Sequence, residues 1–559
     1  MGHTKHFIGL QEEARAVDLF PGADAPSSLA STEHPKGSIV EVRNGNVTLV
    51  AEADSAEAAL YAIAAKRGLD PVFPVAVEDE VRALVETPGI DDPALVDRTD
   101  WPFVTIDGEH SMDLDQAVYV EPEGEGHIVH YALADASHFV VPGTALHAEA
   151  LRRGASYYFP GFMVPMLPRV LSEDLVSLNA DVERRALLIS SHLDGEGVCT
   201  RSELSRVRIR SRGKLSFGGV QAFYDAGGTP KHAGFGDAVD TSLLHLAVVG
   251  KRRMSLAEER GVVRYRRVTA STDLGKGGLR FTAIREVRLE VERYNEQLSL
   301  LCNTEGARLL SEFGDSFVEP VYRAHPAPSE EKMRSFEKVL AALVKYHELP
   351  ESWLWTRQSE TTLRDYLDGL PHAGKEGQVA SAIHRQAVMS NVRSMFQTEA
   401  AGHHGVGAEV YARFSAPMRE MVGVFLHSEL FQGMAGEGHA DEELRAKIVD
   451  GANEAKSIQR AIVNESNRLV LDQIFEDAQA NETKLSAVLM GAARSKAYVR
   501  LQSPPIDAKV YLGRGDEVLR PSDEGAGLSN QEKRFGLGDS VTLTVLGRDE
   551  RDRWELEIL

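Results

Sequence analysis

The sequence predicts an α+β fold in three parts: a short N-terminal module over residues 1–84, a large mixed domain over residues 85–480 and a small β domain over residues 484–559. Two observations predict this division. The middle part mixes short apolar runs typical of strands with long runs of helical apolar spacing, whereas short alternating runs separated by glycines follow Lys484. At 559 residues, the chain is long enough for several domains.

The N-terminal module carries two local signals. Residues 37–51, GSIVEVRNGNVTLVA, alternate around an Asn-Gly-Asn sequence, which is typical of a β-hairpin. Residues 55–67, SAEAALYAIAAKR, predict a helix with Ser55 as its N-cap. Residues 21–37 are rich in Pro, Ala and Ser and predict a loop. We therefore expect a module made of a β-hairpin plus a helix.

Three carboxylates crowd into one short segment of the large domain, residues 105–118, TIDGEHSMDLDQAV. Asp107 ends an apolar run, and Asp113 and Asp115 follow within eight residues, just before a second β-rich run. Such carboxylates repel one another unless a cation lies among them. Hard oxygen ligands at this density suit Mg²⁺ or Mn²⁺. From these residues alone, a metal site and a solvated acidic loop are both open.

The rest of the large domain combines helical patterns with one basic strand. Residues 290–310, 331–346 and 442–478 have helical apolar spacing. In residues 205–215, SRVRIRSRGKL, arginines alternate with Val207 and Ile209, so that one face of a strand would be basic. This face is either a nucleic-acid contact or a sheet face paired with acids. Its members are Arg206, Arg208, Arg210 and Arg212.

Charge and cysteine content narrow the class of protein. The net charge of −22 weighs against a protein that coats nucleic acid with its whole surface, but not against an enzyme with a local basic channel. Two distant cysteines, Cys199 and Cys302, argue against a disulfide scaffold and a zinc site and fit a reducing cytoplasm. No stretch approaches a membrane span, and residues 1–18 lack a signal peptide's apolar core, so we expect a cytoplasmic protein.

The acid loop and four later segments resemble, in order, the motifs of the ribonuclease II / ribonuclease R (RNB) family of 3′→5′ exoribonucleases. TIDGE…MDLD is similar to the metal-binding signature of that family. Together the similar segments span roughly residues 85–480. The others are YALADASHFVVPG at 131–143, RGASYYFPGFMVPMLPRVLSEDLVSL at 153–178, VYRAHPAP at 321–328 and GHHGVGAEVYARFSAPMR at 402–419.

This resemblance implies a fold for each part of the chain. The large domain would be an RNB-type catalytic domain, and the C-terminal β domain would be an S1-like OB-fold barrel that binds RNA. Family members usually carry two small RNA-binding barrels before the catalytic domain. Residues 1–84 are too short for two barrels, so we expect an atypical module there.

The resemblance also implies a chemistry. It is that of a monomeric, processive 3′→5′ exoribonuclease that hydrolyses single-stranded RNA to nucleoside 5′-monophosphates with two divalent ions, Mg²⁺ or Mn²⁺. Asp107 and Asp113 would be metal ligands. Gln116 stands where the family has its fourth aspartate, in the metal shell. Asp115 matches the acid whose loss damages catalysis most, and it would orient the second metal or the attacking water.

Three further residues match positions that contact RNA in the family. Arg419 matches the arginine of the "SPIR" motif, which would hold the scissile phosphate. Tyr158 matches the tyrosine that packs beside the 3′-terminal nucleotide, where an aromatic face accepts any base. Glu296 matches a glutamate near the 3′ end of the RNA.

Several positions depart from the family pattern, and they concentrate near the expected site. Gln116 removes one negative charge, and because Mg²⁺ prefers carboxylates to amides, we expect weaker metal binding. Arg413 replaces a histidine, Glu420 replaces the second arginine of "SPIRR", and Asn467 replaces a glutamate. Two functions therefore stay open: an active exoribonuclease, and a catalytically impaired descendant that binds RNA or a protein partner.

Overall fold

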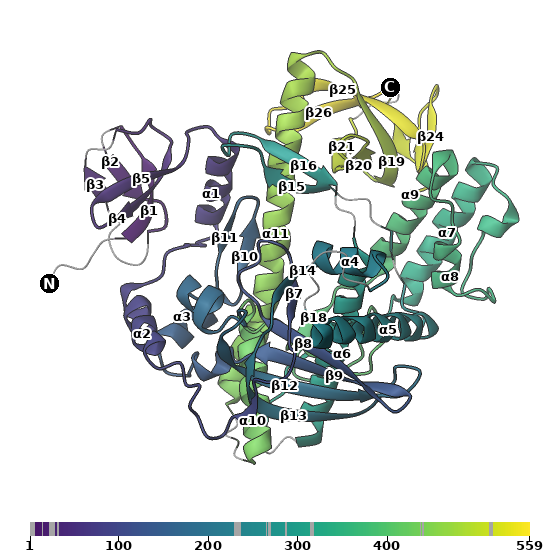
Figure 1. The fold of residues 1–559 in the computed structure, drawn as a ribbon. Helices are drawn as coiled ribbons and strands as arrows, with labels where there is room; N and C mark the ends of the chain where they lie inside the picture. The colour runs from purple at the N-terminus through teal and green to yellow at the C-terminus, as the bar shows by residue number, and fades with distance from the viewer. Residues whose placement is uncertain are drawn as a thin grey trace.

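The computed structural model describes residues 6–13, 15–21, 28–30, 33–228, 236–263, 265–266, 270–285, 288–313, 318–436, 438, 441–513 and 518–559 (Figure 1). Its helices and strands are mixed along the chain, which confirms the predicted α+β class. One helix, α11 (Glu442–Ala480), has 39 residues and is therefore about 58 Å long. Its buried side chains contribute to three separate hydrophobic cores, so that this helix ties the parts of the molecule together.

The N-terminal part has more strands than the sequence indicated. The predicted hairpin is present as β4 and β5, and the predicted helix is present as α1, whose Ala58 N–H donates to the Ser55 hydroxyl at 3.1 Å. Among the described residues, three further strands extend the hairpin into a sheet of order β3-β2-β1-β4-β5. The elements are β1 (His6–Gln11), β2 (Arg15–Asp18), β3 (Ser28–Ala30), β4 (Ile39–Arg43), β5 (Asn46–Ala51), α1 (Ala56–Lys66) and α2 (Val75–Val85).

The large domain is built on one sheet of order β6-β13-β12-β9-β8. The helices α5 and α6 pack against this sheet, and α10 packs against α6. The sheet strands are β6 (Val96–Arg98), β8 (Gln116–Glu123), β9 (Gly126–Ala134), β12 (Glu183–Leu193) and β13 (Cys199–Arg210). The helices are α3 (Ala145–Arg153), α4 (Phe217–Asp225), α5 (Asp237–Glu259), α6 (Glu290–Phe313) and α10 (Met421–Ala435).

Four two-stranded ladders surround the sheet. They are β7 (Thr105–Asp107) with β14 (Lys214–Ser216), β10 (Tyr157–Phe159) with β11 (Phe162–Val164), β15 (Ala270–Leu274) with β16 (Phe281–Arg285), and β17 (Tyr322–Ala324) with β18 (Met395–Gln397). The ladder of β7 with β14 is parallel and places Asp107 beside Ser216. The acid loop joins β7 to β8.

The C-terminal part is a curled sheet of order β21-β20-β19-β25-β26 with a three-stranded sheet beside it. The edge strands β21 and β26 lie against each other, which is consistent with the predicted OB-fold barrel. This barrel shares its core with the helices α7 to α9. The elements are α7 (Glu330–Tyr346), α8 (Leu363–Asp368), α9 (Gly374–Ser390), β19 (Leu485–Ala493), β20 (Lys496–Leu501), β21 (Asp507–Tyr511), β22 (Arg520–Pro521), β23 (Gly527–Ser529), β24 (Arg534–Gly536), β25 (Ser540–Arg548) and β26 (Trp554–Ile558).

Candidate active site

The acid loop connects β7 to β8 and is held in a defined conformation. One carboxylate oxygen of Asp107 accepts the Gly108 N–H at 2.7 Å and the Ser111 hydroxyl at 2.9 Å. The Leu114 N–H donates to the Ser177 hydroxyl at 3.0 Å. Local hydrogen bonds thus fix the loop at both ends, and the second oxygen of Asp107 has no hydrogen bond in the part of the chain that the structure describes.

Asp115 is the buried member of the acid loop, and it binds Arg419. Its Oδ2 accepts the Arg419 Nε–H at 2.5 Å, and its Oδ1 accepts the Met418 backbone N–H at 2.9 Å. The Asp115 side chain is fully buried, whereas the Arg419 side chain is about a third exposed. The pair joins two loops that are 304 positions apart in sequence. Both oxygens of Asp115 are engaged, and its role in the structure is to hold Arg419.

Asp115 and Arg419 stabilise each other's charged forms. Burial raises the pKa of Asp115 to about 6, and the ion pair with Arg419 keeps the carboxylate ionised at neutral pH. The Asp115 charge raises the pKa of Arg419 further above its usual range, and the charges of Asp113 and Asp107 act in the same direction. The positive charge of Arg419 therefore offsets the repulsion among the crowded carboxylates.

Tyr158 lies on the accessible side of the pair. Its hydroxyl donates to Asp113 Oδ2 at 3.3 Å, and the same oxygen is 4.0 Å from Arg419 Nε. Half of the Tyr158 surface is exposed, yet burial raises the pKa of its hydroxyl. These contacts bring together an aromatic face, a guanidinium and a carboxylate.

Gln116 begins β8, and its backbone pairs with Leu133 of β9. Its side chain is partly exposed and makes no hydrogen bond among the described residues. The amide follows Asp115 directly but does not join the Asp115–Arg419 pair. The predicted place of Gln116 in a metal shell stays a prediction.

Side chains of α6 and α10 hold the loop that carries Arg419. Asn303 of α6 accepts the Phe414 N–H at 2.7 Å and donates to the Ser415 hydroxyl at 3.0 Å. His427 of α10 is buried, and its Nε2 lies 3.1 Å from the Phe414 carbonyl oxygen. Since a carbonyl only accepts, Nε2 carries the proton. Buried polar contacts thus fix the backbone just before Arg419.

His427 makes this anchor sensitive to acid. Burial lowers its pKa to about 4, below the usual value near 6.5. The unfolded chain therefore binds a proton at this histidine that the folded chain does not bind. As a result, the free energy of unfolding falls as the pH drops from 6.5 toward 4. We expect His427→Gln, whose amide can still donate to Phe414, to remove about 1.4 kcal/mol of this loss per pH unit. Urea unfolding of both proteins at pH 7.0 and pH 5.0 measures the decrease in unfolding free energy. An equal decrease in the wild type and in His427→Gln would contradict the expectation.

Glu296, which is also predicted to contact RNA, makes its contact outside the acid loop. Glu296 is in the second turn of α6, is exposed, and pairs with Arg288 at 2.9 Å. Asn467 lies on α11, and the neighbouring Glu465 binds Arg67, beyond the end of α1. Glu465 therefore joins α11 to the N-terminal part. No contact of Glu296 or Asn467 reaches Asp115 or Arg419 among the described residues.

The predicted basic strand is present as β13, with Val207 and Ile209 buried and the arginines partly exposed. Two strands separate β13 from β8, which puts it roughly 14 Å from the acid loop's strand. Its arginines are used within the domain. Arg206 pairs with Asp135 and covers the Phe431 ring. Arg208 pairs with Asp97 and Glu183, and Arg210 lies opposite Glu183. Arg212, just after the strand, donates to the carbonyls of Thr99 and Asp100. The alternative of a sheet face paired with acids accounts for these contacts, and RNA binding by them stays a prediction.

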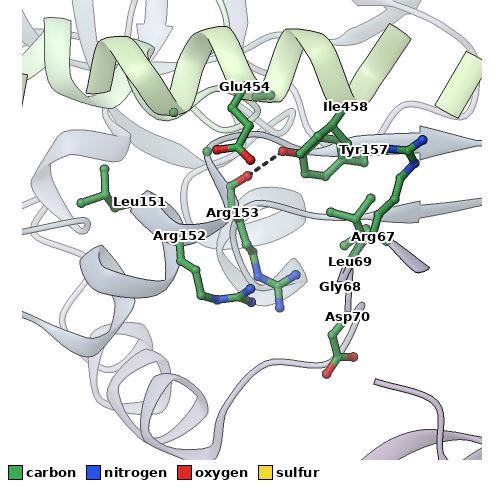
Figure 2. Close-up of a pocket in the computed structure, with 14 residues that line it drawn as sticks. Arg67, Gly68, Leu69, Asp70, Leu151, Arg152, Arg153, Tyr157, Glu454 and Ile458 are labelled. Atoms are coloured by element: carbon green, nitrogen blue, oxygen red, sulfur yellow. Dashed lines mark hydrogen bonds between the residues drawn. The ribbon is translucent and has the colours of Figure 1, made fainter. Parts of the chain in front are cut away.

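A cavity of about 190 Å³ lies behind the site, between the end of α3, β10, α11 and the segment after α1 (Figure 2). Tyr157 lines it, whereas Tyr158 projects from the other face of the same strand. Its arginines are already paired: Arg67 with Glu465, and both Arg152 and Arg153 with Glu149. Arg419, Asp115 and Tyr158 do not line this cavity.

The acid loop fits a divalent ion that is bound partly by the substrate. In the described ranges, no three His, Cys, Asp or Glu side chains gather closely enough to hold a metal by themselves. Mg²⁺, however, is commonly bound by one or two carboxylates together with water and substrate phosphate. Among the described residues, Asp107 and Asp113 each keep a carboxylate oxygen that is not hydrogen-bonded, and both lie near enough to Arg419 to raise its pKa. These two residues would provide the donors for such an ion.

Comparisons with known proteins place this site in a family. The model of the RNB domain matches residues 96–433. Ribonuclease R of Escherichia coli K12 is 28% identical over 503 residues, which cover 86% of this chain, and Exoribonuclease 2 of Klebsiella pneumoniae is 28% identical over 80% of it. The matches span 59% and 68% of those relatives' lengths.

Solved structures show the same fold. Mycoplasma genitalium RNase R in complex with ribose-methylated single-stranded RNA superposes with a TM-score of 0.79 at 18% identity, covering 99% of this chain and 89% of that one. Yeast Ssd1, described as a pseudonuclease, superposes with a TM-score of 0.62 at 14% identity, covering 94% of this chain and 68% of that one. The fold is thus shared by a nuclease and a pseudonuclease, so residues of the site must decide between the two functions.

Two further predictions can be compared with the described residues. Cys199 and Cys302 are both free thiols. Within the described ranges, no helix combines the length and the apolar character that crossing a membrane requires.

Proposed function

The chain belongs to the RNB family, and from this premise we propose that it is a metal-dependent 3′→5′ exoribonuclease acting on single-stranded RNA. The observation that carries the proposal is the Asp115–Arg419 pair, which presents a fixed guanidinium beside Asp113 and Tyr158. A guanidinium binds phosphate through parallel hydrogen bonds, and the ring stacks on a base without regard to sequence. This arrangement of side chains suits the 3′ end of an RNA strand.

Each side chain would have a distinct task. Arg419 would hold the scissile phosphate, and Asp115 would fix the guanidinium in place. Tyr158 would pack on the terminal nucleotide. Asp107 and Asp113 would hold Mg²⁺ or Mn²⁺, which when bound neutralises phosphate charge and activates water for hydrolysis to nucleoside 5′-monophosphates. The second ion predicted from the sequence stays a prediction, because Asp115 is committed to Arg419.

The C-terminal barrel would guide the strand toward Arg419 and Tyr158. Two tyrosines on neighbouring strands lie under cations: Lys496 and Arg553 lie over the Tyr511 ring at 5.3 and 4.4 Å, and Arg385 lies over Tyr498 at 4.9 Å. Aromatic faces interleaved with basic groups are the common means by which OB-folds hold single strands.

The direct test is incubation of the pure full-length chain with 5′-labelled single-stranded RNA, in Mg²⁺ or Mn²⁺ and then in chelator. We expect progressive shortening from the 3′ end that stops when the metal is removed. RNA binding without shortening would overturn the proposal and favour the impaired descendant, for which the replacement of the fourth family aspartate by Gln116 is the motivating observation.

Gln116→Asp tests whether position 116 belongs to the metal shell. The change restores the family carboxylate, so we expect tighter metal binding, with the Mg²⁺ concentration for half-maximal cleavage lowered about tenfold. Titration of cleavage rate against Mg²⁺ measures this. Glu109→Asp, a conservative change of an exposed acid in the same loop, is the matched control. An unaltered titration in Gln116→Asp would place position 116 outside the shell.

A further inference from the structure

A group of cations lies directly beside Arg419 without contributing to the site described above. Glu420, the next residue, is buried and accepts a hydrogen bond from Lys456 Nζ of α11 at 2.8 Å. Its other oxygen is 3.5 Å from Arg413 Nε. Burial acts to raise the pKa of Glu420, but Arg413 and Lys456 bring it to about 2, so the carboxylate is charged. The family's histidine and second arginine are thus replaced by an arginine and a glutamate that contact each other.

Two more cations extend this group, and we call Arg323, Arg413, Lys456 and Arg460 the basic basin. Burial lowers the pKa of Arg323, and the charges of Arg413 and Arg460 lower it further. Glu420 is the only carboxylate within 4.0 Å of any basin member among the described residues. It lies within that distance of Arg413 and Lys456.

The basin lies beside the segment that leads into β10, the strand that carries Tyr158. Lys456 and Arg460 are four residues apart on α11 and lie on one face of that helix. Gln459, on the same turn, donates to the Ser156 carbonyl at 3.3 Å, two residues before Tyr158. The side chains of Arg413 and Lys456 are 30% and 22% exposed, and Arg460 is exposed. Solvent, and hence a ligand, can reach the cations.

Like charges held this close are costly unless an anion joins them. Glu420, which contacts Arg413 and Lys456, directly follows Arg419 in the chain. A strand whose phosphate lies on Arg419 therefore brings its neighbouring phosphate toward the basin. We infer that the basic basin binds the phosphodiester immediately 5′ of the scissile one, with Glu420 as the counter-ion that spaces Arg413 and Lys456. This inference rests on the proposed RNA substrate, and it does not require that cleavage occurs.

Equilibrium binding in chelator tests it with the full chain and a labelled single-stranded oligoribonucleotide. Arg460→Gln removes an exposed charge that pairs with no carboxylate in the described part of the chain, and Lys456→Gln removes its neighbour on the helix face. We expect each to weaken binding about three- to tenfold and to reduce the slope of log affinity against log salt by about 0.7. Lys447→Gln is the matched control, since Lys447 is nine residues from Lys456 and on the opposite face of α11.

A scan of uncharged methylphosphonate linkages along the oligonucleotide locates the contact. For the wild type we expect affinity to drop when the scissile linkage or the next linkage on its 5′ side is neutral. In Arg460→Gln with Lys456→Gln, the second drop should vanish while the first remains. Equal drops in wild type and variant, or an equal loss in Lys447→Gln, would overturn the inference. If the scan succeeds and Mg²⁺ produces no shortening, the basin stands and the proposed activity fails.

Discussion

Asp115→Asn should abolish RNA shortening, with turnover reduced by about 10²–10³-fold or more and RNA affinity changed by less than about threefold. The neutral amide keeps the volume of the side chain but no longer attracts the guanidinium of Arg419. Because Asp115 is fully buried against Arg419 and the Met418 N–H, its loss releases the group proposed to hold the scissile phosphate. Single-turnover cleavage of end-labelled RNA measures the first effect, and anisotropy in chelator measures the second.

The control for this variant is Asp477→Asn, an aspartate that pairs with Arg280 on the surface. Removing one partner of a buried ion pair costs about 3–5 kcal/mol, so the thermal unfolding of Asp115→Asn must be followed as well. A variant that is folded at the assay temperature, binds RNA and still cleaves at the wild-type rate would remove Asp115 from the mechanism.

Arg419→Lys should lower kcat by about 10²-fold and change KM much less. Lysine keeps one positive charge among the three carboxylates, which protects the fold, but it lacks the planar fork that holds Asp115 and a phosphate together. Steady-state cleavage over a range of RNA concentrations separates kcat from KM. Arg468→Lys, on an exposed part of α11, is the matched control.

The double variant shows whether the two residues act as a unit. If Asp115 works through Arg419, Asp115→Asn with Arg419→Lys should cleave no more slowly than the worse single variant. Fully additive losses would mean that Asp115 has a task of its own, such as orienting water or a second metal ion.

Long elements with clear periodicity could be predicted from the sequence. The helices α6, α7 and α11 lie where apolar spacing placed them, and the C-terminal strands follow the alternating runs. The strand β1 was missed because Phe7, Ile8 and Gly9 are buried in succession, and a continuous apolar run does not distinguish a strand from other buried segments. The predicted N-terminal hairpin was therefore only part of a larger sheet.

The candidate site was predictable in its members but not in its contacts. Family motifs pointed to Asp115 and Arg419, yet no local rule could pair residues 304 positions apart. Arg413 and Glu420 looked in the sequence like two separate losses. In the structure Arg413 lies 3.5 Å from Glu420, and Lys456, which sequence reasoning missed, pairs with the same carboxylate. The only signal in the sequence was the spacing of Lys456 and Arg460, which puts both on one face of a helix. That spacing does not show that Glu420 lies against this face.

The central claim is that the acid loop and Arg419 together bind a phosphodiester with the help of a hard cation. The most direct measurement is a crystal structure of the chain with a non-hydrolysable single-stranded RNA and Mn²⁺, with the ion located by anomalous scattering. We expect Mn²⁺ at about 2.1–2.2 Å from carboxylate oxygens of Asp107 and Asp113, on the phosphate that Arg419 contacts. RNA seated on Tyr158 and Arg419 with no ion, and with both carboxylates turned toward solvent, would contradict the account.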